Sequence, residues 1–337
     1  MVSVPTSQLE FSVSAAPFSA QGDGVTDDAG DIQATMTACS SAGGGIVRIP
    51  PGTFMVSTTL TLPSNVVLAG AGMGATVIQA MNGMNKDVIA TAGGTTITSF
   101  CGVSSLTING NKAGNASGAS LNLQAVQSCV IDKVHVLNGA GIGILFQAAD
   151  SSHQSLDNWV VNCRVEGTRN ECIKLSNLAP DNFIKHNRIG PNDGGAGIAV
   201  IEVHNVLIGN RVNQSAAEGI YTNAQFGTFT GNQLENCAGP GLSLDAGSNH
   251  CAATGNICFN NGQGGAAPGI RVAGNYNAVT GNACMDNQGV KTQSYGIQIV
   301  SGATTNVAAA NITRSADHLT GGLLDSGTTS VLSANAT

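Results

Sequence analysis

Apolar and polar residues alternate over short runs in this chain, and the runs recur at a regular interval. In the second half each run is a Gly followed by an apolar, a variable and an apolar residue, as at residues 197–200, 219–222, 241–244, 269–272 and 296–299. Alternation with a period of two is typical of a β-strand, and no ten-residue stripe of helical period fits between the runs. The pattern therefore predicts a series of short strands, one set in each repeat.

A row of asparagines marks the same repeat. Its members are Asn187, Asn210, Asn232, Asn256, Asn282, Asn311 and Asn335. Successive members are 22 residues (210 to 232) to 29 residues (282 to 311) apart. Self-similarity at such an interval is typical of a solenoid. We therefore predict an all-β fold, a right-handed parallel β-helix of about ten coils.

The asparagine row has a physical explanation. Corresponding turns of successive coils lie about 4.8 Å apart, and an amide side chain carries both a donor and an acceptor. A stack of Asn side chains can therefore bond to itself along the axis. Asn311 begins a glycosylation sequon, but we expect it to be buried in this row. Upstream, we follow the same position back through Cys163 and Asp132 to Ser104.

One helix is predicted, over residues 29–40. Asp28 is a suitable N-cap, Ile32, Met36 and Cys39 follow at helical spacing, and a run of three glycines ends the pattern at 43–45. Such a helix would cap the first coil, whose apolar interior is otherwise exposed. We accordingly divide the chain into an N-terminal arm with its capping helix (1–45) and one continuous β-helix domain (46–337).

Composition narrows the choice of partners. Charged residues make up 10% of the chain, the net charge is −7 and there is no basic run, which argues against nucleic acid and anionic membranes as partners. No stretch of 18 apolar residues exists, and no signal peptide is visible. We expect an extracellular or virion-associated protein, with a homotrimer as one assembly.

The nine cysteines match neither a disulfide framework nor a zinc site. Cys258 and Cys284 both stand two residues after a member of the asparagine row, where other repeats carry Ile, Val or Leu. We predict that all nine are free thiols and that these two stack inside the coils. His186 and His204 have no metal-ligand spacing and no Asp cluster is suited to calcium, so we predict no metal and no cofactor.

The opening of the chain resembles that of the pectate-lyase-like β-helix superfamily, and within it mannuronan epimerases and phage tailspike depolymerases. The resemblance rests on residues 18–28, 43–54, 70–78 and 106–112. It implies a β-helix and a carbohydrate ligand. Mannuronan epimerases carry catalytic Tyr, Asp and His on a strand after a Gly. The corresponding residues 141–147 here contain none of the three, so the resemblance does not imply that activity.

Candidate chemistry lies on the face that the repeated strands turn outwards. Between the inward apolar residues, the variable position forms an outward row of Gly143, Lys174, Ala199, Tyr221, Ser243, Arg271 and Gln298. A second row contains Asn223 and Asp245, while Glu171, Glu202, Glu218 and His204 flank the strands. We predict as catalytic residues Glu218, Asp245, Tyr221 and Glu202, and as substrate-binding residues Lys174, Arg271, Asn223, Glu171 and His204. The alternative for each is a solvated surface residue.

Two functions from different classes fit this face. One is a carbohydrate-active enzyme that cleaves or rearranges a poly- or oligosaccharide, either a glycoside hydrolase or transferase with two carboxyl groups, or a polysaccharide lyase with a base and a cation. The other is a non-enzymatic β-helix shaft or glycan-binding protein, such as a virion tail or adhesin component. Clustered Glu, Tyr, Asp and Arg favour the enzyme, while the low charge of the rest of the body favours the shaft.

Overall fold

The alternating runs form short parallel β-strands, which wind into a right-handed parallel β-helix of about 12 coils in this computed structural model. The predicted all-β fold is confirmed, and the count of about ten coils was slightly low. The structure describes residues 9–337, which fall into two compact units, residues 9–164 and 165–337. The predicted division at residue 45 stays a prediction, and residues 1–8 of the predicted arm lie outside the described residues.

The first unit begins with the predicted helix and continues in irregular coils. Its strands β5, β8, β11 and β14 pair in parallel in that order, and β10 pairs with β6, β7 and β13. The elements are β1 (Glu10–Ser12), β2 (Asp23–Asp27), α1 (Ala29–Ser41), β3 (Gly45–Arg48), β4 (Gly52–Val56), β5 (Leu60–Leu62), β6 (Val66–Ala69), β7 (Thr76–Ala80), β8 (Ile89–Thr91), β9 (Thr98–Ser99), β10 (Gly102–Asn109), β11 (Leu121–Gln124), β12 (Val126–Gln127), β13 (Val130–Leu137), β14 (Ile144–Gln147) and β15 (Trp159–Val161).

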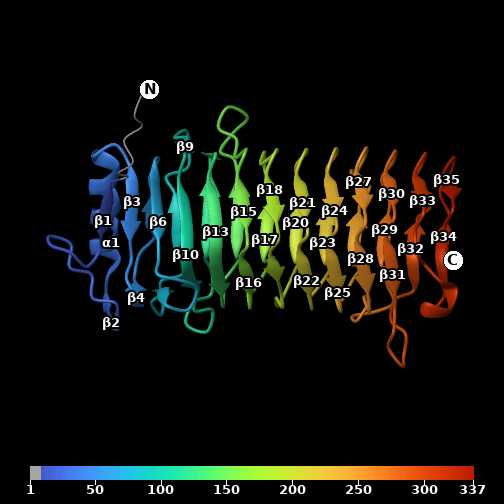
Figure 1. Ribbon diagram of the computed structural model, residues 1–337, viewed down its shortest axis with the longest axis horizontal. Helices are drawn as coiled ribbons and strands as arrows, with labels where there is room; N and C mark the ends of the chain where they lie inside the picture. The colour runs from blue at the N-terminus through green and yellow to red at the C-terminus, as the bar shows by residue number, and fades with distance from the viewer. Residues whose placement is uncertain (1–8) are drawn as a thin grey trace, which may run out of the picture. The chain divides into compact units, whose positions relative to one another are not determined.

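Helix α1 confirms the expected capping element. It lies beside β1 and β3 (Figure 1) and also contacts β5. Ile32, Met36 and Cys39 are fully buried, as their spacing predicts. Asp28 does not cap the helix with its side chain. Its carboxylate instead accepts the backbone N–H groups of Gln21 (2.6 Å) and Gly22 (3.2 Å), and so fixes the preceding turn. Neither α1 nor the short 3₁₀ helix η1 (Ser315–Asp317), the two helices of residues 9–337, is long and apolar enough to cross a membrane.

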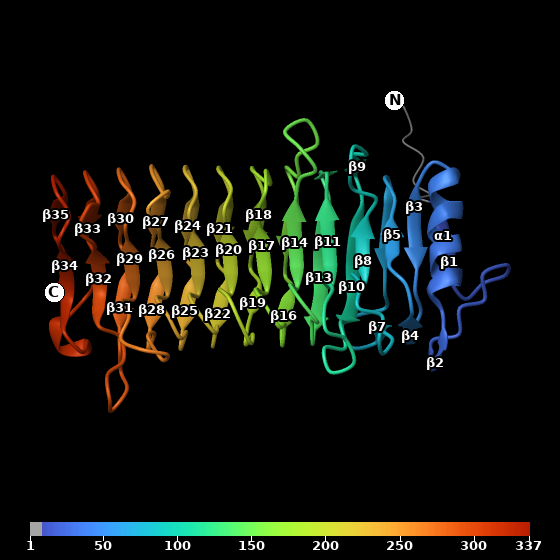
Figure 2. The same ribbon diagram turned by 180° about the vertical axis from the view of Figure 1, so that it is seen from behind.

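The second unit is the regular repeat. Strands β17, β20, β23, β26, β29, β32 and β34 form one parallel sheet with one strand from each coil (Figure 2). Each coil adds further short strands on its remaining sides. The strands are β16 (Arg164–Glu166, which starts at the end of the first unit), β17 (Ile173–Leu175), β18 (Phe183–Lys185), β19 (Arg188–Ile189), β20 (Ile198–Val200), β21 (Val206–Ile208), β22 (Arg211–Asn213), β23 (Ile220–Thr222), β24 (Thr228–Thr230), β25 (Gln233–Glu235), β26 (Leu242–Leu244), β27 (Ala252–Thr254), β28 (Ile257–Phe259), β29 (Ile270–Val272), β30 (Ala278–Thr280), β31 (Ala283–Met285), β32 (Tyr295–Ile299), β33 (Val307–Ala309), β34 (Gly321–Asp325) and β35 (Val331–Ser333).

The asparagine row is a continuous hydrogen-bonded ladder in the second unit. From Asn187 to Asn311, each side-chain Nδ2 donates to the Oδ1 of the next member at 2.9–3.0 Å. The other N–H of the amide reaches a backbone carbonyl of the preceding coil, as from Asn232 to Leu207 at 3.1 Å. Asn311 is 1% exposed, so its sequon is buried as expected.

In the first unit the ladder position was assigned two residues too early. Asp132 pairs with Val161, and Ser104 pairs with Asp132. Val134 donates its backbone N–H to Cys163 Sγ at 3.5 Å, as each ladder residue does to the side chain of the next, so Val134 occupies the ladder position. Its register partner Leu106 occupies this position one coil earlier. Both are fully buried. Because an apolar residue at this position looks like part of an ordinary strand, the sequence carries no signal for it.

A second amide row was missed in the sequence. It stands five residues before the ladder, where Asn182 N donates to Asn205 Oδ1 at 2.8 Å and Asn277 N donates to Asn306 Oδ1 at 2.9 Å. Gly227 and Cys251 occupy the same position in the coils between them. This interrupted row would have been visible as a fixed offset from the ladder residues.

All nine cysteines are buried and free. Cys258 and Cys284 are register partners on β28 and β31, which confirms their predicted stacking. Burial raises the pKa of the Cys163 thiol to about 12, so this sulfur is a neutral packing group at physiological pH.

Candidate functional site

The outward row predicted from the sequence exists in the second unit. The strand register aligns Lys174 with Ala199, Ala199 with Tyr221, Tyr221 with Ser243, Ser243 with Arg271 and Arg271 with Gln298. Its proposed first member, Gly143, does not belong to such a row. Gly143 is buried, and the outward residue of β14 is Leu145, which pairs with Asn122.

Large and small side chains alternate along this row. Ala199 is 4% exposed and Ser243 is 2% exposed, although both stand at outward positions. They are covered because the longer Lys174, Tyr221 and Arg271 on the neighbouring coils flank them. Of these two small residues, Ala199 lines a pocket of the face, which is a part of the site that the sequence did not reveal.

Asp245 is the centre of one network on this face. It accepts a hydrogen bond from the Tyr221 hydroxyl at 3.1 Å and forms an ion pair with Arg271 (Nη1 to Oδ1, 2.9 Å). The predicted residues Tyr221, Asp245 and Arg271 therefore meet. Each is partly exposed, so the network can contact a ligand.

The network holds its members in defined protonation states. Partial burial opposes ionisation of Asp245, but the hydrogen bonds from Arg271 and Tyr221 outweigh it, and the pKa of Asp245 is lower than usual. The pKa of Tyr221 is raised by burial and by its bond to Asp245, with a further contribution from the charge of Glu218. At neutral pH the pair is a carboxylate and a phenol, so Tyr221 can donate a hydrogen bond but is a poor base.

A small pocket runs along the neighbouring strands β17, β20 and β23 and includes Tyr221 of this network. Its volume is about 200 Å³, and it is lined by Glu171, Gly195, Ala196, Ala199, Ile201, Glu218 and Tyr221. Glu171 forms an ion pair with Lys174 at 2.9 Å. A Cβ added at Gly195 would lie 2.9 Å from Glu171 Cγ, so the Glu171 side chain packs directly against this glycine. No ion pair to Glu218 occurs in residues 9–337.

Register explains why the two glutamates share this pocket. Glu171 stands two residues before β17, Ala196 two before β20 and Glu218 two before β23. These three strands are consecutive and in register. Two carboxyl groups therefore flank the small Ala196 from alternate coils, whose backbones are about 10 Å apart. The sequence had assigned Glu171 to substrate binding, and its pairing with Glu218 becomes visible once the coils are aligned.

Glu218 and Asp245, by contrast, lie at opposite ends of their strands. The register continues from Thr222 and Leu244 to place Asp245 beside Asn223, which is five residues after Glu218. Five residues of strand span about 16 Å. The structure therefore relates both residues to Tyr221 without making them a carboxyl pair.

The other predicted residues lie in the turn that follows these strands. Glu202 accepts the backbone N–H of Leu178 at 2.7 Å, and Asn223 accepts that of Gly247 at 2.7 Å. Both side chains hold turns of neighbouring coils together. His204 faces Asp181 at 3.5 Å, and its ring stacks on Phe226. The stack continues through His250 to Tyr276, with ring centroids 5.0–5.4 Å apart.

The arrangement offers carboxylates, a phenol and two cations, and no cluster of metal ligands. Within residues 9–337, no three His, Cys, Asp or Glu side chains gather closely enough to hold a metal ion.

The chain is similar in sequence to bacterial mannuronan epimerases and to a phage appendage protein. Mannuronan C5-epimerase AlgE5 of Azotobacter vinelandii is 29% identical over 218 residues, covering 54% of this chain and 22% of that protein. The preneck appendage protein of Bacillus phage PZA is 30% identical over 228 residues, covering 60% of this chain and 26% of that protein. The chain thus spans about a fifth to a quarter of the length of these relatives.

Solved structures agree on the fold. The A-module of mannuronan C-5 epimerase AlgE6 from A. vinelandii matches with a TM-score of 0.67 at 22% identity, covering 95% of this chain and 99% of the module. A family model for right-handed β-helix regions matches residues 182–336. The model for rhamnogalacturonase A/epimerase, pectate-lyase-like proteins matches residues 12–243. Since this last match spans well over half of the sequence, the chain belongs to the rhamnogalacturonase A/epimerase, pectate-lyase-like family.

Proposed function

We propose that this chain is a carbohydrate-active enzyme that hydrolyses or transfers a glycan lying across the outward face of the second unit. The observation that carries the proposal is the pair Glu171 and Glu218, which flank one pocket from alternate coils. Inverting glycoside hydrolysis uses two carboxyl groups about 6.5–9.5 Å apart, with a water molecule between them. Side chains rooted about 10 Å apart on alternate coils can reach that separation.

The surroundings of the two glutamates suggest different roles. Glu171, which is ion-paired with Lys174, is suited to act as the base that activates water. Glu218 has no ion partner in the described part of the chain and is suited to act as the acid that protonates the leaving oxygen. Tyr221, which also lines the pocket, and Asp245 and Arg271 beyond it would bind hydroxyl groups of the next sugar units.

Charge narrows the substrate class to a neutral glycan. Three acidic side chains (Glu171, Glu218 and Asp245) stand against two basic ones, and both cations already have a carboxylate partner. A polyuronate would bring further negative charge to a face with no unpaired cation. A β-elimination needs the carboxyl group of a uronate beside the C–H that loses its proton. A neutral substrate therefore favours hydrolysis or transfer over a lyase reaction.

The test is a reducing-sugar assay over neutral and uronate polysaccharides, with absorbance at 235 nm to detect elimination products. We expect reducing ends from a neutral glycan and no absorbance change. Glu218→Gln and Glu171→Gln should each lower turnover by at least about a hundredfold, the usual weight of acid–base catalysis, with an unchanged melting temperature. Glu202→Gln is the matched control, because the Glu202 carboxylate accepts the backbone N–H of Leu178 and does not line the pocket. Full turnover in both pocket variants would refute the assignment.

A second candidate is a non-enzymatic shaft or glycan-binding protein. It is favoured by the mutual neutralisation of Glu171 with Lys174 and of Asp245 with Arg271, and by the relative from a phage appendage. Binding of a glycan with no product over long incubation would identify this function. The same relative supports an extracellular or virion-associated location. The homotrimer stays a prediction, which sedimentation equilibrium would test through a mass of three chains.

A further inference from the structure

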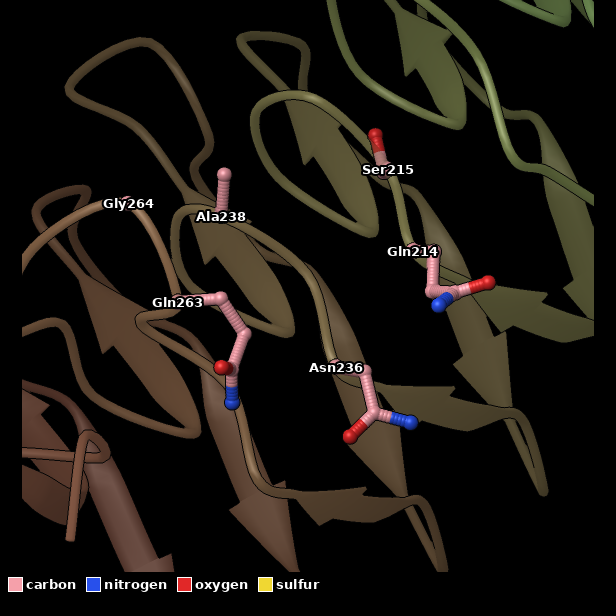
Figure 3. Close-up of a pocket in the computed structure, with 6 residues that line it drawn as sticks. All are labelled: Gln214, Ser215, Asn236, Ala238, Gln263 and Gly264. Atoms are coloured by element: carbon pink, nitrogen blue, oxygen red, sulfur yellow. The ribbon is translucent and has the colours of Figure 1, made fainter. Parts of the chain in front are cut away.

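A second pocket of the second unit lies on the turns that precede the sheet of the candidate site, and it is built from amides. Its volume is about 430 Å³, within the range of small-molecule sites. The six lining residues are Gln214, Ser215, Asn236, Ala238, Gln263 and Gly264 (Figure 3). None of them carries a charge. We propose that this amide groove, defined by these six residues, binds a neutral segment of a glycan through its hydroxyl groups.

The floor of the amide groove is a stack of small residues. Ala238 N donates to Ser215 O at 2.9 Å, and Gly264 N donates to Ala238 O at 3.0 Å, so the three residues follow one another from coil to coil. A Cβ at Gly264 would lie 3.1 Å from the Cβ of Ala238. The groove exists because these three positions hold nothing larger than a hydroxymethyl group.

The wall of the groove consists of three side-chain amides. Gln214 and Asn236 have left-handed backbone conformations (φ 56° and 54°), which turn successive coils sharply at this corner. Gln263 comes from the longer turn of the next coil. In Figure 3 the three side chains project away from their turns, next to the small residues of the floor.

Hydrogen bonds among neighbours fix how these amides are oriented. Asn236 Nδ2 donates to Asn213 Oδ1 at 3.1 Å, and Asn213 Nδ2 donates to Gln214 Oε1 at 3.4 Å. Gln263 Nε2 donates to Asn260 O at 2.6 Å and to Thr292 Oγ1 at 3.1 Å. Each amide thus uses one of its two ends within the protein.

The unused ends define the ligand. Asn236 Oδ1 and Gln263 Oε1 remain as acceptors and Gln214 Nε2 remains as a donor, since no residue of 9–337 bonds to them. Two acceptors and one donor on consecutive coils match a row of hydroxyl groups, each of which can donate and accept. The groove has no cation for a phosphate or uronate, no ring for a nucleobase and no large apolar side chain for a lipid.

The groove is connected to the proposed catalytic pocket. Ser215 Oγ donates to Gly195 O at 3.2 Å, and Gly195 lines the pocket of Glu171 and Glu218. Glu218 itself follows Ser215 by three residues in the same turn. The amide groove is therefore placed to hold units of the same chain beyond the reacting ones. The amide groove and the proposed catalytic pocket would bind the same class of ligand, but binding in the groove does not require turnover in the pocket.

The test is calorimetric titration of the whole chain with neutral hexasaccharides (maltohexaose, cellohexaose and mannohexaose) and with an alginate hexamer. We expect binding of a neutral hexasaccharide and none of the alginate hexamer. Asn236→Ala and Gln263→Ala should each weaken binding by about three- to tenfold, the weight of one hydrogen bond. Ala238→Leu, which fills the groove, should abolish it. Gln225→Ala is the control, because Gln225 is an exposed amide on a different turn.

Melting temperatures of all variants separate loss of the groove from loss of the fold. Absence of neutral hexasaccharide binding by the parent, or equal binding by the parent, Asn236→Ala, Gln263→Ala and Ala238→Leu, would overturn the inference. The double variant Glu171→Gln/Glu218→Gln distinguishes the two proposals. If groove variants weaken binding in that background while the parent shows no turnover, the groove stands and the proposed activity fails. If the parent turns over glycan and the groove variants bind as it does, the activity stands and the groove fails.

Discussion

In both units a residue with a left-handed backbone conformation precedes the ladder position, but the ladder position itself is filled differently. In the first unit Ser105 (φ 54°, within β10) and Lys133 (φ 52°, within β13) adopt this conformation, and the buried residues after them are Leu106 and Val134. In the second unit Gly209, Gly231, Gly255 and Gly281 (φ 62–65°) adopt it between two strands, and an Asn follows each one. The left-handed backbone conformation is therefore common to both units, and it does not determine which side chain follows it.

The difference indicates that burying side-chain amides destabilises the fold little when each amide bonds to the next, and costs free energy when an amide is buried without such partners. Each ladder Asn offers its Oδ1 to the backbone N–H and the side chain of the preceding member, as Asn232 does for Asn210 at 3.0 Å. Without neighbours above and below, the same amide would be buried without partners, which costs roughly 1–3 kcal/mol for each unpaired group. The ladder position accordingly holds apolar residues at Leu106 and Val134 of the first unit and an unbroken run of amides from Asn187 to Asn335 in the second.

Breaking the ladder in its middle should have the largest effect. Asn232→Ala removes the acceptor of Asn210 and the donor to Asn256 and to the backbone carbonyl of Leu207. With more than one buried group left unpaired, we expect a loss of about 3 kcal/mol or more in the free energy of unfolding. Urea denaturation measures it. Asn335→Ala is the control, because Asn335 is half-buried at the last step of the ladder and should cost much less. Equal losses would mean that the amides do not act as a set.

Placing an amide in the apolar stack is the converse test. Val134→Asn puts a side-chain amide between Leu106 and the weak acceptor Cys163 Sγ. We expect a loss of about 2 kcal/mol, since the new donor and acceptor are buried with poor partners. Val134→Thr, of nearly the same shape, separates the cost of polarity from that of volume. A Val134→Asn protein as stable as its parent would contradict the rule drawn from the two units.

The same contrast explains what could be predicted from the sequence. The ladder of the second unit is a row of one residue type at a fixed interval, and strand alternation decides which residues point outwards, so Tyr221 and Arg271 could be placed on one face in advance. In the first unit Leu106 and Val134 resemble any buried strand residue. The ladder position was therefore assigned to Ser104 and Asp132, two residues too early.

The candidate site depended on information that alternation does not contain. Glu171 and Glu218 become a pair through the register of three coils whose turns differ in length. Glu202 stands near the same strands, yet it turns towards the N–H of Leu178, a contact that no sequence interval predicts. The sequence was sufficient to predict which residues point outwards. The partner of each side chain could be identified only from the register of the stacked coils.

A row of stacked rings on the surface of the second unit should contribute less to stability than the buried asparagine ladder. The rings of His204, Phe226, His250 and Tyr276 stack from coil to coil, but Phe226 is 47% exposed. Phe226→Ala removes two ring contacts and leaves no buried polar group without a partner. We expect a loss of about 1 kcal/mol, well below that of Asn232→Ala. Thermal unfolding checks this, with Gln225→Ala as the neighbouring control. A loss as large as that in the buried ladder would show that exposure is not what separates the two rows.

The smallest effects concern two carboxyl groups, one in each unit, that respond to pH in opposite directions. Asp28 and Asp286 are both buried and both accept backbone N–H bonds. Burial raises the pKa of Asp28 above its ordinary value of 3.8 in spite of its bonds from Gln21 and Gly22. In Asp286 burial acts in the same direction, but three backbone bonds, from Gln293, Gln288 and Thr292, outweigh it and lower the pKa.

Linkage gives the sign of each effect. The raised pKa of Asp28 stabilises the folded state fully below pH 3.8, and this contribution is lost as the pH rises through the pKa of the folded state. The lowered pKa of Asp286 stabilises the folded state above pH 3.8, and this contribution is lost as the pH falls below that value. Between pH 7 and 4, acidification should therefore stabilise the parent relative to Asp28→Asn. Below pH 3.8 it should destabilise the parent relative to Asp286→Asn. Urea midpoints of the three proteins at pH 7, 5, 4 and 3 measure both differences, and groups common to all three cancel in the subtraction. The same sign for both variants would mean that the number of N–H donors does not decide between burial and hydrogen bonding at these two sites.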